Sequence, residues 1–284
     1  MEHVVWTSRP RLRRPVLIAA FEGWNDAGEA ATFAARYLAD QWGARPFATI
    51  DPEDFYDFTS TRPQVRLDDG QQREIVWPSN ELSACSVPGA DLDVIVLLGS
   101  EPQLRWRTFC SQIVEVAQAH EVRLAVTLGA LLAEVPHSRP VSVVGTAYDP
   151  ELVRRLDLRQ STYEGPTGIV GVLHDAFRQG GVPSASLWAT VPTYVPGAPS
   201  PKAALALIER TTELLAVPVQ TTDLQIATAA YERQLDELVA DDDDTAAYVA
   251  GLEQAADETP ADAEPDPARL IEEVERFLRD NPST

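Results

Sequence analysis

An apolar strand that turns directly into an amphipathic helix is the feature that most limits what this chain can fold into. Residues 15–21 read PVLIAAF, an unbroken apolar run of the kind found in parallel sheets that are covered on both faces. A helix is predicted over residues 27–41, where apolar side chains recur every three or four positions. Together these elements predict an α/β fold.

The turn between these two elements carries small and polar residues. Asn25 or Asp26 is the expected helix N-cap, because a short side-chain oxygen accepts a hydrogen bond from a first-turn amide. Gly23 and Gly28, on either side of Trp24, let the backbone approach another group closely. This layout is typical of a ligand crevice at the carboxyl end of a strand. A capped turn that binds nothing is the alternative interpretation.

Strand-like apolar runs recur along the chain with helical patterns between them, which predicts a mostly parallel sheet. Further strands are predicted at 46–50, 74–77, 93–98, 123–130, 141–145 and 186–191. Further helices are predicted at 104–119, from the glycine-bearing segment 164–171 to 179, from Ser200 onward, over 222–238 and over 245–256.

The segment 51–71 interrupts this alternation and reads as a long excursion rather than a turn. Long irregular segments in compact domains are usually functional or lie at an interface. Phe55, Tyr56 and Phe58 stand among acidic residues there, which suggests a subunit contact. A simple surface loop is the alternative.

Three parts are predicted: an α/β core domain over 1–217, a small helical appendage over 218–258, and an acidic linker with a terminal amphipathic helix over 259–284. The linker is rich in acids and proline, which disfavour a packed core. The terminal helix has one apolar stripe and is too short to be stable alone in water. We therefore expect the stripe to dock, by preference on the chain's own core.

The net charge is −21 and is concentrated at one end, since residues 236–284 hold 16 acidic and 3 basic side chains. An acidic surface repels phosphate backbones, so we expect no nucleic-acid partner. No apolar run approaches the roughly 20 residues of a membrane span, so no membrane association is expected either. Residues 1–6 lack the basic-then-apolar pattern of a secretion signal, and we expect a cytoplasmic protein.

The chain offers few residues for metal or cofactor chemistry. Cys85 and Cys110 are too few for a disulfide framework and have no metal-ligand spacing. Lys202 is the only lysine, and its position in the first turn of a helix gives it no special claim as a Schiff-base amine. We expect neither a metal nor a cofactor.

Three glycines spaced three apart, Gly165, Gly168 and Gly171, open the predicted helix that ends near residue 179. The spacing matches neither the dinucleotide fingerprint nor a Walker loop. Thr167 can cap the helix, and the free amides around Gly168 could hold an anion. Close packing of the helix against a strand by small residues is the alternative.

Glu101 and Arg105 follow the strand predicted at 93–98, at the sheet edge where α/β proteins bind ligands. Glu101 could bind a hydroxyl group, and Arg105 could bind a carboxylate or phosphate. We favour a structural role, in which the two side chains pair with each other or with a neighbouring subunit.

Two of the four histidines, His137 and His174, are candidates for proton transfer. No Gly-x-Ser-x-Gly elbow supplies a nucleophile for either of them. His174 falls within an apolar helical pattern, so we expect a hydrogen-bonded core histidine there.

Five blocks in a fixed order resemble the bacterial, uncharacterised branch of the proteasome assembly chaperone 2 family, over about residues 5–215. The blocks are 21–28 (FEGWNDAG), 99–106 (GSEPQLRW), 128–137 (LGALLAEVPH), 165–169 (GPTGI) and 199–203 (PSPKA). The resemblance implies a three-layer αβα sandwich similar to purine nucleoside phosphorylases, with a helical C-terminal extension. It also implies homo-oligomers, with trimers as one form. Eukaryotic members help to assemble proteasome α-rings, whereas bacterial members have no settled activity.

Two functions remain open at this point. The first is a non-enzymatic, oligomeric module that binds a protein partner or assists assembly. The second is a nucleoside phosphorylase- or hydrolase-like enzyme, or a binder of an anion or nucleoside, and it predicts that three strand-end loops converge on one cleft. That pocket would be built by Gly23, Trp24, Asn25, Asp26, Glu101, Arg105, Gly165, Thr167 and Gly168.

Overall fold

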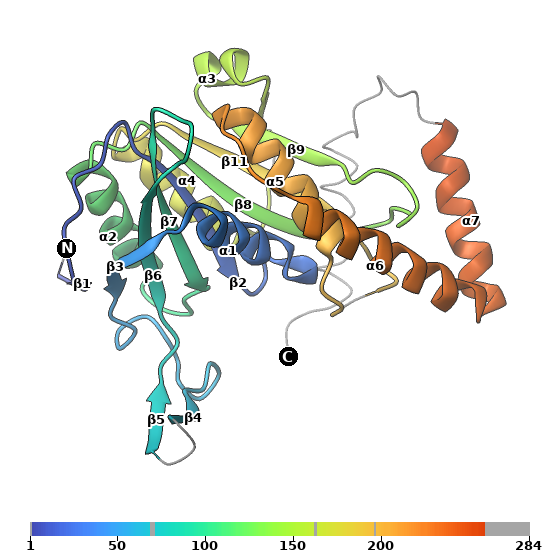
Figure 1. Ribbon diagram of the computed structural model, residues 1–284, viewed down its shortest axis with the longest axis horizontal. Helices are drawn as coiled ribbons and strands as arrows, with labels where there is room; N and C mark the ends of the chain where they lie inside the picture. The colour runs from blue at the N-terminus through green and yellow to red at the C-terminus, as the bar shows by residue number, and fades with distance from the viewer. Residues whose placement is uncertain (1, 69–71, 162–163, 196, 259–284) are drawn as a thin grey trace.

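The computed structural model describes residues 2–68, 72–161, 164–195 and 197–258, so the predicted linker and terminal helix over 259–284 lie outside the described residues. A nine-stranded sheet forms the middle of the molecule (Figure 1). In spatial order its strands are β1 (Val4–Trp6), β3 (Arg45–Ile50), β6 (Asn80–Ser86), β7 (Asp93–Ser100), β2 (Val16–Glu22), β8 (Leu124–Ala133), β11 (Ser184–Pro192), β9 (Val143–Ala147) and β10 (Arg159–Gln160).

The sheet is mixed rather than mostly parallel as predicted, although its centre and the edge pair β9–β10 are parallel. The neighbours β7, β2, β8 and β11 run parallel to one another. Strands β1, β3 and β6 extend the sheet on one side in antiparallel pairs, and β9 pairs antiparallel with β11 on the other side. The central strand β2 is buried along six of its seven residues, which explains why its sequence is continuously apolar rather than alternating.

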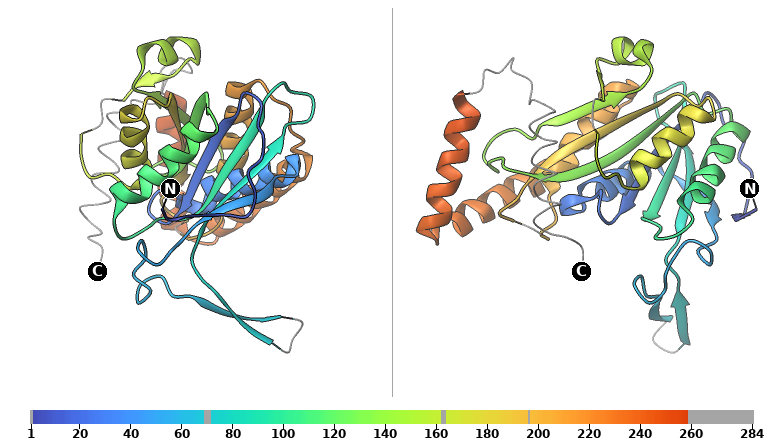
Figure 2. Two further views of the ribbon diagram at one scale, coloured as in Figure 1. Left: turned by 90° about the vertical axis from the view of Figure 1, so that its left-hand side faces the viewer. Right: turned by 180° about the vertical axis from the view of Figure 1, so that it is seen from behind.

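Helices cover both faces of this sheet, which gives three layers (Figures 1 and 2). On one face lie α1 (Ala30–Trp42) and α5 (Pro201–Leu215), which pack against each other and share one core cluster with Ile18 of β2. On the other face lie α2 (Trp106–Ala119) and α4 (Ile169–Gln179), which pack against each other and share a second core cluster with Leu17 and Phe21 of β2. Alternate residues of β2 therefore enter two different cores, as the period of a strand requires.

The first helix begins later than its apolar pattern predicted. A short 3₁₀ turn, η1 (Ala27–Glu29), precedes α1, and Gly28 and Glu29 both have positive φ there, at 58° and 51°. Two residues in the left-handed region cannot belong to a right-handed helix, so the regular helix starts only at Ala30. A short helix, α3 (Pro150–Arg155), lies between β9 and β10.

The helical appendage consists of α6 (Thr222–Ala240) and α7 (Asp243–Glu258). Helix α6 packs on α5, and Leu224 joins the core beneath it. Helix α7 turns away from α6 at the far end of the molecule (Figure 1). Among the described residues, no helix is both long enough and apolar enough to cross a membrane.

The excursion after β3 contains a hairpin that the sequence pattern only partly predicted. Strands β4 (Gln64–Asp68) and β5 (Gln72–Val76) pair with each other and project from the body (Figures 1 and 2). Phe55 and Tyr56, expected at a subunit contact, are instead buried in the chain's own core, at 0% and 3% exposure. Of the three aromatics, only Phe58 stays partly exposed, where it packs on Trp77.

Candidate functional site

The loops that follow β2 and β7 and the segment that opens α4 meet at the carboxyl edge of the parallel strands, as expected for a crevice. Asn25 Nδ2 donates a hydrogen bond to Glu101 Oε1 at 3.1 Å. The backbone N–H of Ile169, the first residue of α4, donates to the same oxygen at 2.7 Å. One carboxylate from the loop after β7 therefore connects all three segments.

Glu101 takes the position that an external anion would take at the start of α4. The N-terminus of a helix has unpaired amides and a partial positive charge, so it favours a negative group. Gly168 is the N-cap and has no side chain to offer, and Thr167 is exposed and makes no capping bond. The expectation that Thr167 caps α4 is therefore wrong, because the Glu101 carboxylate from the loop after β7 performs this role.

Two glycines make this close approach feasible. Gly23 has φ +123°, a backbone conformation that side chains other than glycine rarely adopt. A Cβ added to Gly168 would lie 2.5 Å from Asn25 Nδ2, so no larger residue fits without moving the amide. Asn25 is 2% exposed, and its Oδ1 is buried without a hydrogen-bond partner among the described residues.

Asp26, rather than Asn25, provides the cap of α1. Its Oδ1 accepts hydrogen bonds from the backbone N–H groups of Ala31 at 2.7 Å and Thr32 at 3.2 Å, and the Thr32 hydroxyl donates to its Oδ2. Burial raises the pKa of the Asp26 carboxyl, while the hydrogen bonds from Thr32 and Ala31 act in the opposite direction. Asp26 thus has its carboxylate fully engaged in its own helix.

The remaining predicted site residues do not gather around a common ligand position. Arg105 pairs with Asp54 at 3.0 Å rather than with Glu101, and its backbone lies in the left-handed region at φ 52°. Of the two structural roles left open, pairing of Glu101 with Arg105 is therefore wrong, and pairing with a neighbouring subunit stays a prediction. Trp24 is 44% exposed, and Gly165 is exposed as well.

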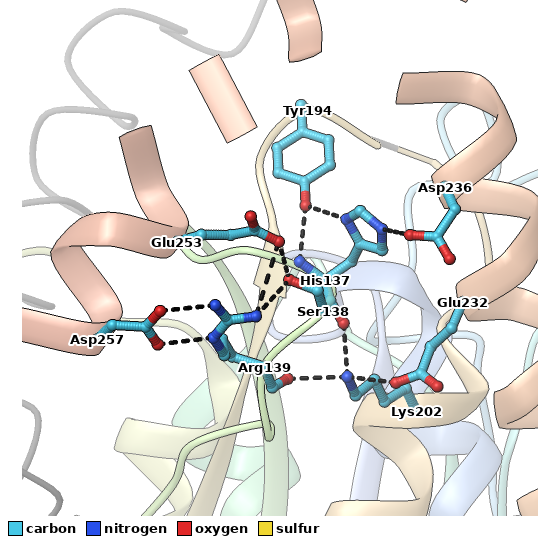
Figure 3. A network of polar contacts seen from close by, with 9 residues as sticks. All are labelled: His137, Ser138, Arg139, Tyr194, Lys202, Glu232, Asp236, Glu253 and Asp257. Atoms are coloured by element: carbon cyan, nitrogen blue, oxygen red, sulfur yellow. Dashed lines mark hydrogen bonds and ion pairs between the residues drawn. The ribbon is translucent and has the colours of Figure 1, made fainter. Parts of the chain in front are cut away.

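A second polar network joins the core to α6 and α7 (Figure 3). His137, in the loop after β8, accepts or donates through both ring nitrogens, with Nδ1 2.7 Å from the Tyr194 hydroxyl and Nε2 3.1 Å from Asp236 Oδ1. Its backbone N–H also donates to the Tyr194 hydroxyl at 2.7 Å. His137 is 4% exposed, so these contacts fix a buried imidazole between β11 and α6.

The only lysine holds this network together. Lys202 Nζ donates to the backbone oxygens of His137 and Arg139, the latter at 2.8 Å, and forms an ion pair with Glu232 of α6. Sequence reasoning gave Lys202 no role, because its three contacts lie between 30 and 65 positions away in the chain.

Arg139 continues the network to α7. Its Nε and Nη2 donate to the two carboxylate oxygens of Asp257 at 2.8 and 2.7 Å, a bidentate pair that raises the pKa of the guanidinium. Ser138 donates to Glu253 on the same helix. A cavity of about 100 Å³ lies beside the network, and His137, Thr190 and Tyr231 are among the residues that line it.

His174 lies apart from both places and is a structural residue, as predicted. Its Nε2 lies 2.9 Å from the Thr127 hydroxyl, and its Nδ1 lies 3.0 Å from the Ser184 hydroxyl. Burial lowers the pKa of His174 to about 4, so the ring is neutral near pH 7. Within the described ranges, no group of three or more His, Cys, Asp or Glu side chains could hold a metal ion.

Comparison with known proteins places the chain in a family. The family model described as PAC2 family matches residues 20–239. A PAC2 family protein from Streptomyces avermitilis is 46% identical, with a TM-score of 0.77 over 83% of this chain and 99% of the other. A Mycobacterium tuberculosis proteasome-assembly chaperone homologue, Rv2125, is also 46% identical, with a TM-score of 0.76 over 82% and 99%.

More distant proteins share the fold alone. Pyrococcus furiosus PbaB, an archaeal proteasome activator, is 19% identical with a TM-score of 0.68, over 83% of this chain and 97% of that one. A search of curated proteins gives no match. On the family model and the two relatives at 46% identity, this chain belongs to the PAC2 family.

Proposed function

We propose that this chain is an oligomeric protein-binding module that assists assembly, with proteasome components as its partner class. The proposal is supported by membership of the PAC2 family and by the 46% identity to a proteasome-assembly chaperone homologue. We further propose that it acts as a homo-oligomer, with trimers as one form, in the cytoplasm, without nucleic acid. The division into parts 1–217, 218–258 and 259–284 belongs to the same proposal.

The observation that carries this proposal is the internal use of Glu101. A catalytic or anion-binding edge needs a group that is free to meet substrate. Here the carboxylate already accepts hydrogen bonds from Asn25 and from the Ile169 amide. Asp26 is likewise engaged with α1. The edge is thus built to hold three segments in place, which suits a binding scaffold better than a reaction centre.

The test is capture of a purified partner by the full chain. Recombinant proteasome α-type subunits from the same organism are passed over immobilised protein, and bound subunit is measured. We expect capture by the full chain, and loss of capture by a chain ending at residue 258, because the acidic segment 259–284 is proposed to supply the partner contact. Absence of capture by the full chain would refute the assembly role, and equal capture by the truncated chain would refute the role of the segment.

A second candidate, binding of a nucleoside, has one observation in its favour. The buried Oδ1 of Asn25 has no hydrogen-bond partner among the described residues, and it lies beside Gly168 at the converging loops. An unpaired buried acceptor is unfavourable, and a ligand N–H would satisfy it. The adjacent Glu101 carboxylate would repel an anion, so the candidate ligand is a neutral nucleoside. This candidate rests in part on the likeness to nucleoside phosphorylases, which stays a proposal.

Thermal-shift measurements test this candidate directly. A nucleoside present at 100 times its dissociation constant adds about 2.7 kcal/mol to the free energy of unfolding. We expect a higher melting temperature with nucleosides, no change with phosphate, and no change with nucleosides for Asn25→Ala. No shift with any nucleoside would eliminate the candidate.

A further inference from the structure

A small cavity lies beside the polar network of Figure 3, next to the C-terminal end of α7. Its volume is about 100 Å³, and its walls come from the loop after β8, the end of β11, the start of α5, and the helices α6 and α7. None of the residues that line it belongs to the three loops around Glu101. The cavity is therefore separate from the edge that could hold a nucleoside.

Much of the cavity wall is apolar. Apolar side chains line it from the loop after β8, from β11 and from α7, among them Val135, Pro140, Val141, Pro192 and Ala256. An engineered apolar cavity of about 150 Å³ in another protein stays dry and binds benzene. The present cavity is smaller, so it has room for a molecule of about five non-hydrogen atoms, such as a four-carbon chain with one polar end.

One hydroxyl group at the cavity wall has no hydrogen-bond partner. Thr190 of β11 is 3% exposed, and its backbone N–H donates to Ser142 O at 3.2 Å. Its side-chain oxygen bonds to no residue that the structure describes, and protein atoms do not enclose it. Tyr231 also lines the cavity and has an unpaired hydroxyl, but protein atoms enclose that one. Thr190 is thus the group that a polar ligand atom would meet, and a hydrogen bond to it would be a net gain.

The charges around the cavity favour a neutral occupant. The lysine and the arginine that line it are already paired with carboxylates, Lys202 with Glu232 and Arg139 with Asp257. No aspartate or glutamate is among the described residues that line it. An anion would find no unpaired cation there, and a cation would find no carboxylate. Since an unpaired charge is costly to take out of water, the fitting ligand carries no charge.

Helix α7 forms one wall of the cavity, through Ala256, and can move away from it. Val249 is the one buried residue of this helix. The end of the helix is held to the loop after β8 by the bidentate pair between Arg139 and Asp257, at 2.8 and 2.7 Å. A segment with so few buried apolar contacts opens at a low cost in free energy. Opening of α7 therefore gives a small molecule a way in that leaves the sheet intact.

We propose that this cavity binds a small neutral molecule with a short apolar body and one hydroxyl group, which bonds to Thr190 and is enclosed by α7. The apolar wall holds the body of the molecule, and the unpaired threonine hydroxyl selects its polar end. This site does not depend on capture of a proteasome subunit or on binding of a nucleoside.

Titration of the full chain with n-butanol, followed by two-dimensional NMR of the backbone amides, tests the proposal. Butyrate and butylammonium are titrated in parallel, because they end a similar chain in a negative or a positive group. We expect n-butanol to shift the amide signals of Ser142, Thr190 and Tyr231 in a saturable way. Binding of the two ions should be about tenfold weaker or less. The amides of β3, on the other side of the sheet, should not shift.

Thr190→Val tests the polar contact, because it removes the hydroxyl and keeps the shape of the side chain. We expect the affinity for n-butanol to fall about three- to tenfold, as the loss of one hydrogen bond predicts. The melting temperature should not fall, because the hydroxyl has no partner in the unliganded protein. Thr49→Val is the matched control: it makes the same change on β3, outside the cavity, and should bind n-butanol as the native chain does.

Asp257→Ala tests the wall formed by α7. It removes the carboxylate that pairs with Arg139, so the helix should open more often and n-butanol should bind more weakly. Asp244→Ala is the control, because it removes an exposed carboxylate from the other end of the same helix. This control should bind n-butanol with the native affinity.

Four outcomes would overturn the inference. The first is the absence of any saturable shift with n-butanol, which would leave water as the only occupant of the cavity. The others are equal binding of butyrate or butylammonium, native affinity in Thr190→Val, and native affinity in Asp257→Ala. Failure to capture a proteasome subunit would refute the proposed assembly role and leave this site standing.

Discussion

Lys202 of α5 and Glu232 of α6 form an ion pair in which the lysine side chain is only 13% exposed. The same ammonium group donates to the backbone oxygens of His137 and Arg139. A single side chain thus ties the loop after β8 to the first helix of the appendage (Figure 3).

Replacing Lys202 by methionine should lower the free energy of unfolding by roughly 1–3 kcal/mol, because it leaves partly buried acceptors without a donor. Urea unfolding of the two proteins measures the difference. Arg36→Met is the matched control, since Arg36 is 58% exposed and pairs with an exposed Glu22 at 3.6 Å. It should change stability by less than about 1 kcal/mol. Equal effects of the two substitutions would contradict a special role for Lys202.

Replacing Gly168 by alanine should destabilise the protein by about 1–3 kcal/mol, because the added Cβ must displace the Asn25 amide and break its bond to Glu101. Gly251→Ala is the control: it lies inside α7, and a Cβ there meets no atom within 4 Å. This control should be neutral or stabilising by up to about 1 kcal/mol. The melting temperatures of the two variants are compared with that of the native protein. An unchanged melting temperature for Gly168→Ala would contradict the close contact between Gly168 and Asn25.

The stability of the protein should fall as the pH is lowered from about 6.5 to 4, in part through His174. The folded state holds the pKa of this ring at about 4, so its unfolded form binds a proton at a higher pH than its folded form does. Linkage then makes the unfolded state more favourable as pH falls, by up to about 3 kcal/mol from this group. Urea unfolding at pH 7, 5.5 and 4.5 should show a shallower pH dependence for His174→Gln. Parallel curves for the two proteins would contradict the assignment.

Replacing Arg139 by alanine should loosen α7 without unfolding the core. The bidentate pair with Asp257 and the contact with Glu253 link this helix to the loop after β8. Hydrogen exchange followed by mass spectrometry should show faster exchange in α7 and unchanged exchange in β2 and β8. Arg233→Ala, an exposed position on α6, is the control and should leave α7 as in the native protein. Faster exchange throughout the chain would indicate global destabilisation instead.

Local pattern predicted the elements whose signal lies within one stretch of sequence. The apolar run of β2, the amphipathic helices and the core position of His174 all follow from the spacing of apolar residues, and the structure agrees with them. Even there, the pattern assigned Ala27 to the first helix, because periodicity does not register the positive φ of Gly28 and Glu29.

The spacing of apolar residues did not predict which side chains from distant segments contact each other. The sequence did not separate Asn25 from Asp26 as the cap, since both have short polar side chains. It also left open whether Glu101 pairs with the nearby Arg105 or with a neighbouring subunit. In the folded chain Glu101 instead meets Asn25, 76 positions earlier, and the Ile169 amide, 68 positions later. The path of the backbone decides which of several chemically suitable groups a side chain contacts.

The sequence by itself determined the α/β class, the presence of helices after residue 217 and the acidic charge. The tertiary structure alone decided that Glu101 caps α4, that Lys202 braces α6, and that the hairpin of β4 and β5 projects from the body. The physical reason is one of range. Burial and helix periodicity act among near neighbours in the chain, whereas hydrogen bonds and ion pairs form between whichever groups long-range packing places within about 3 Å of each other.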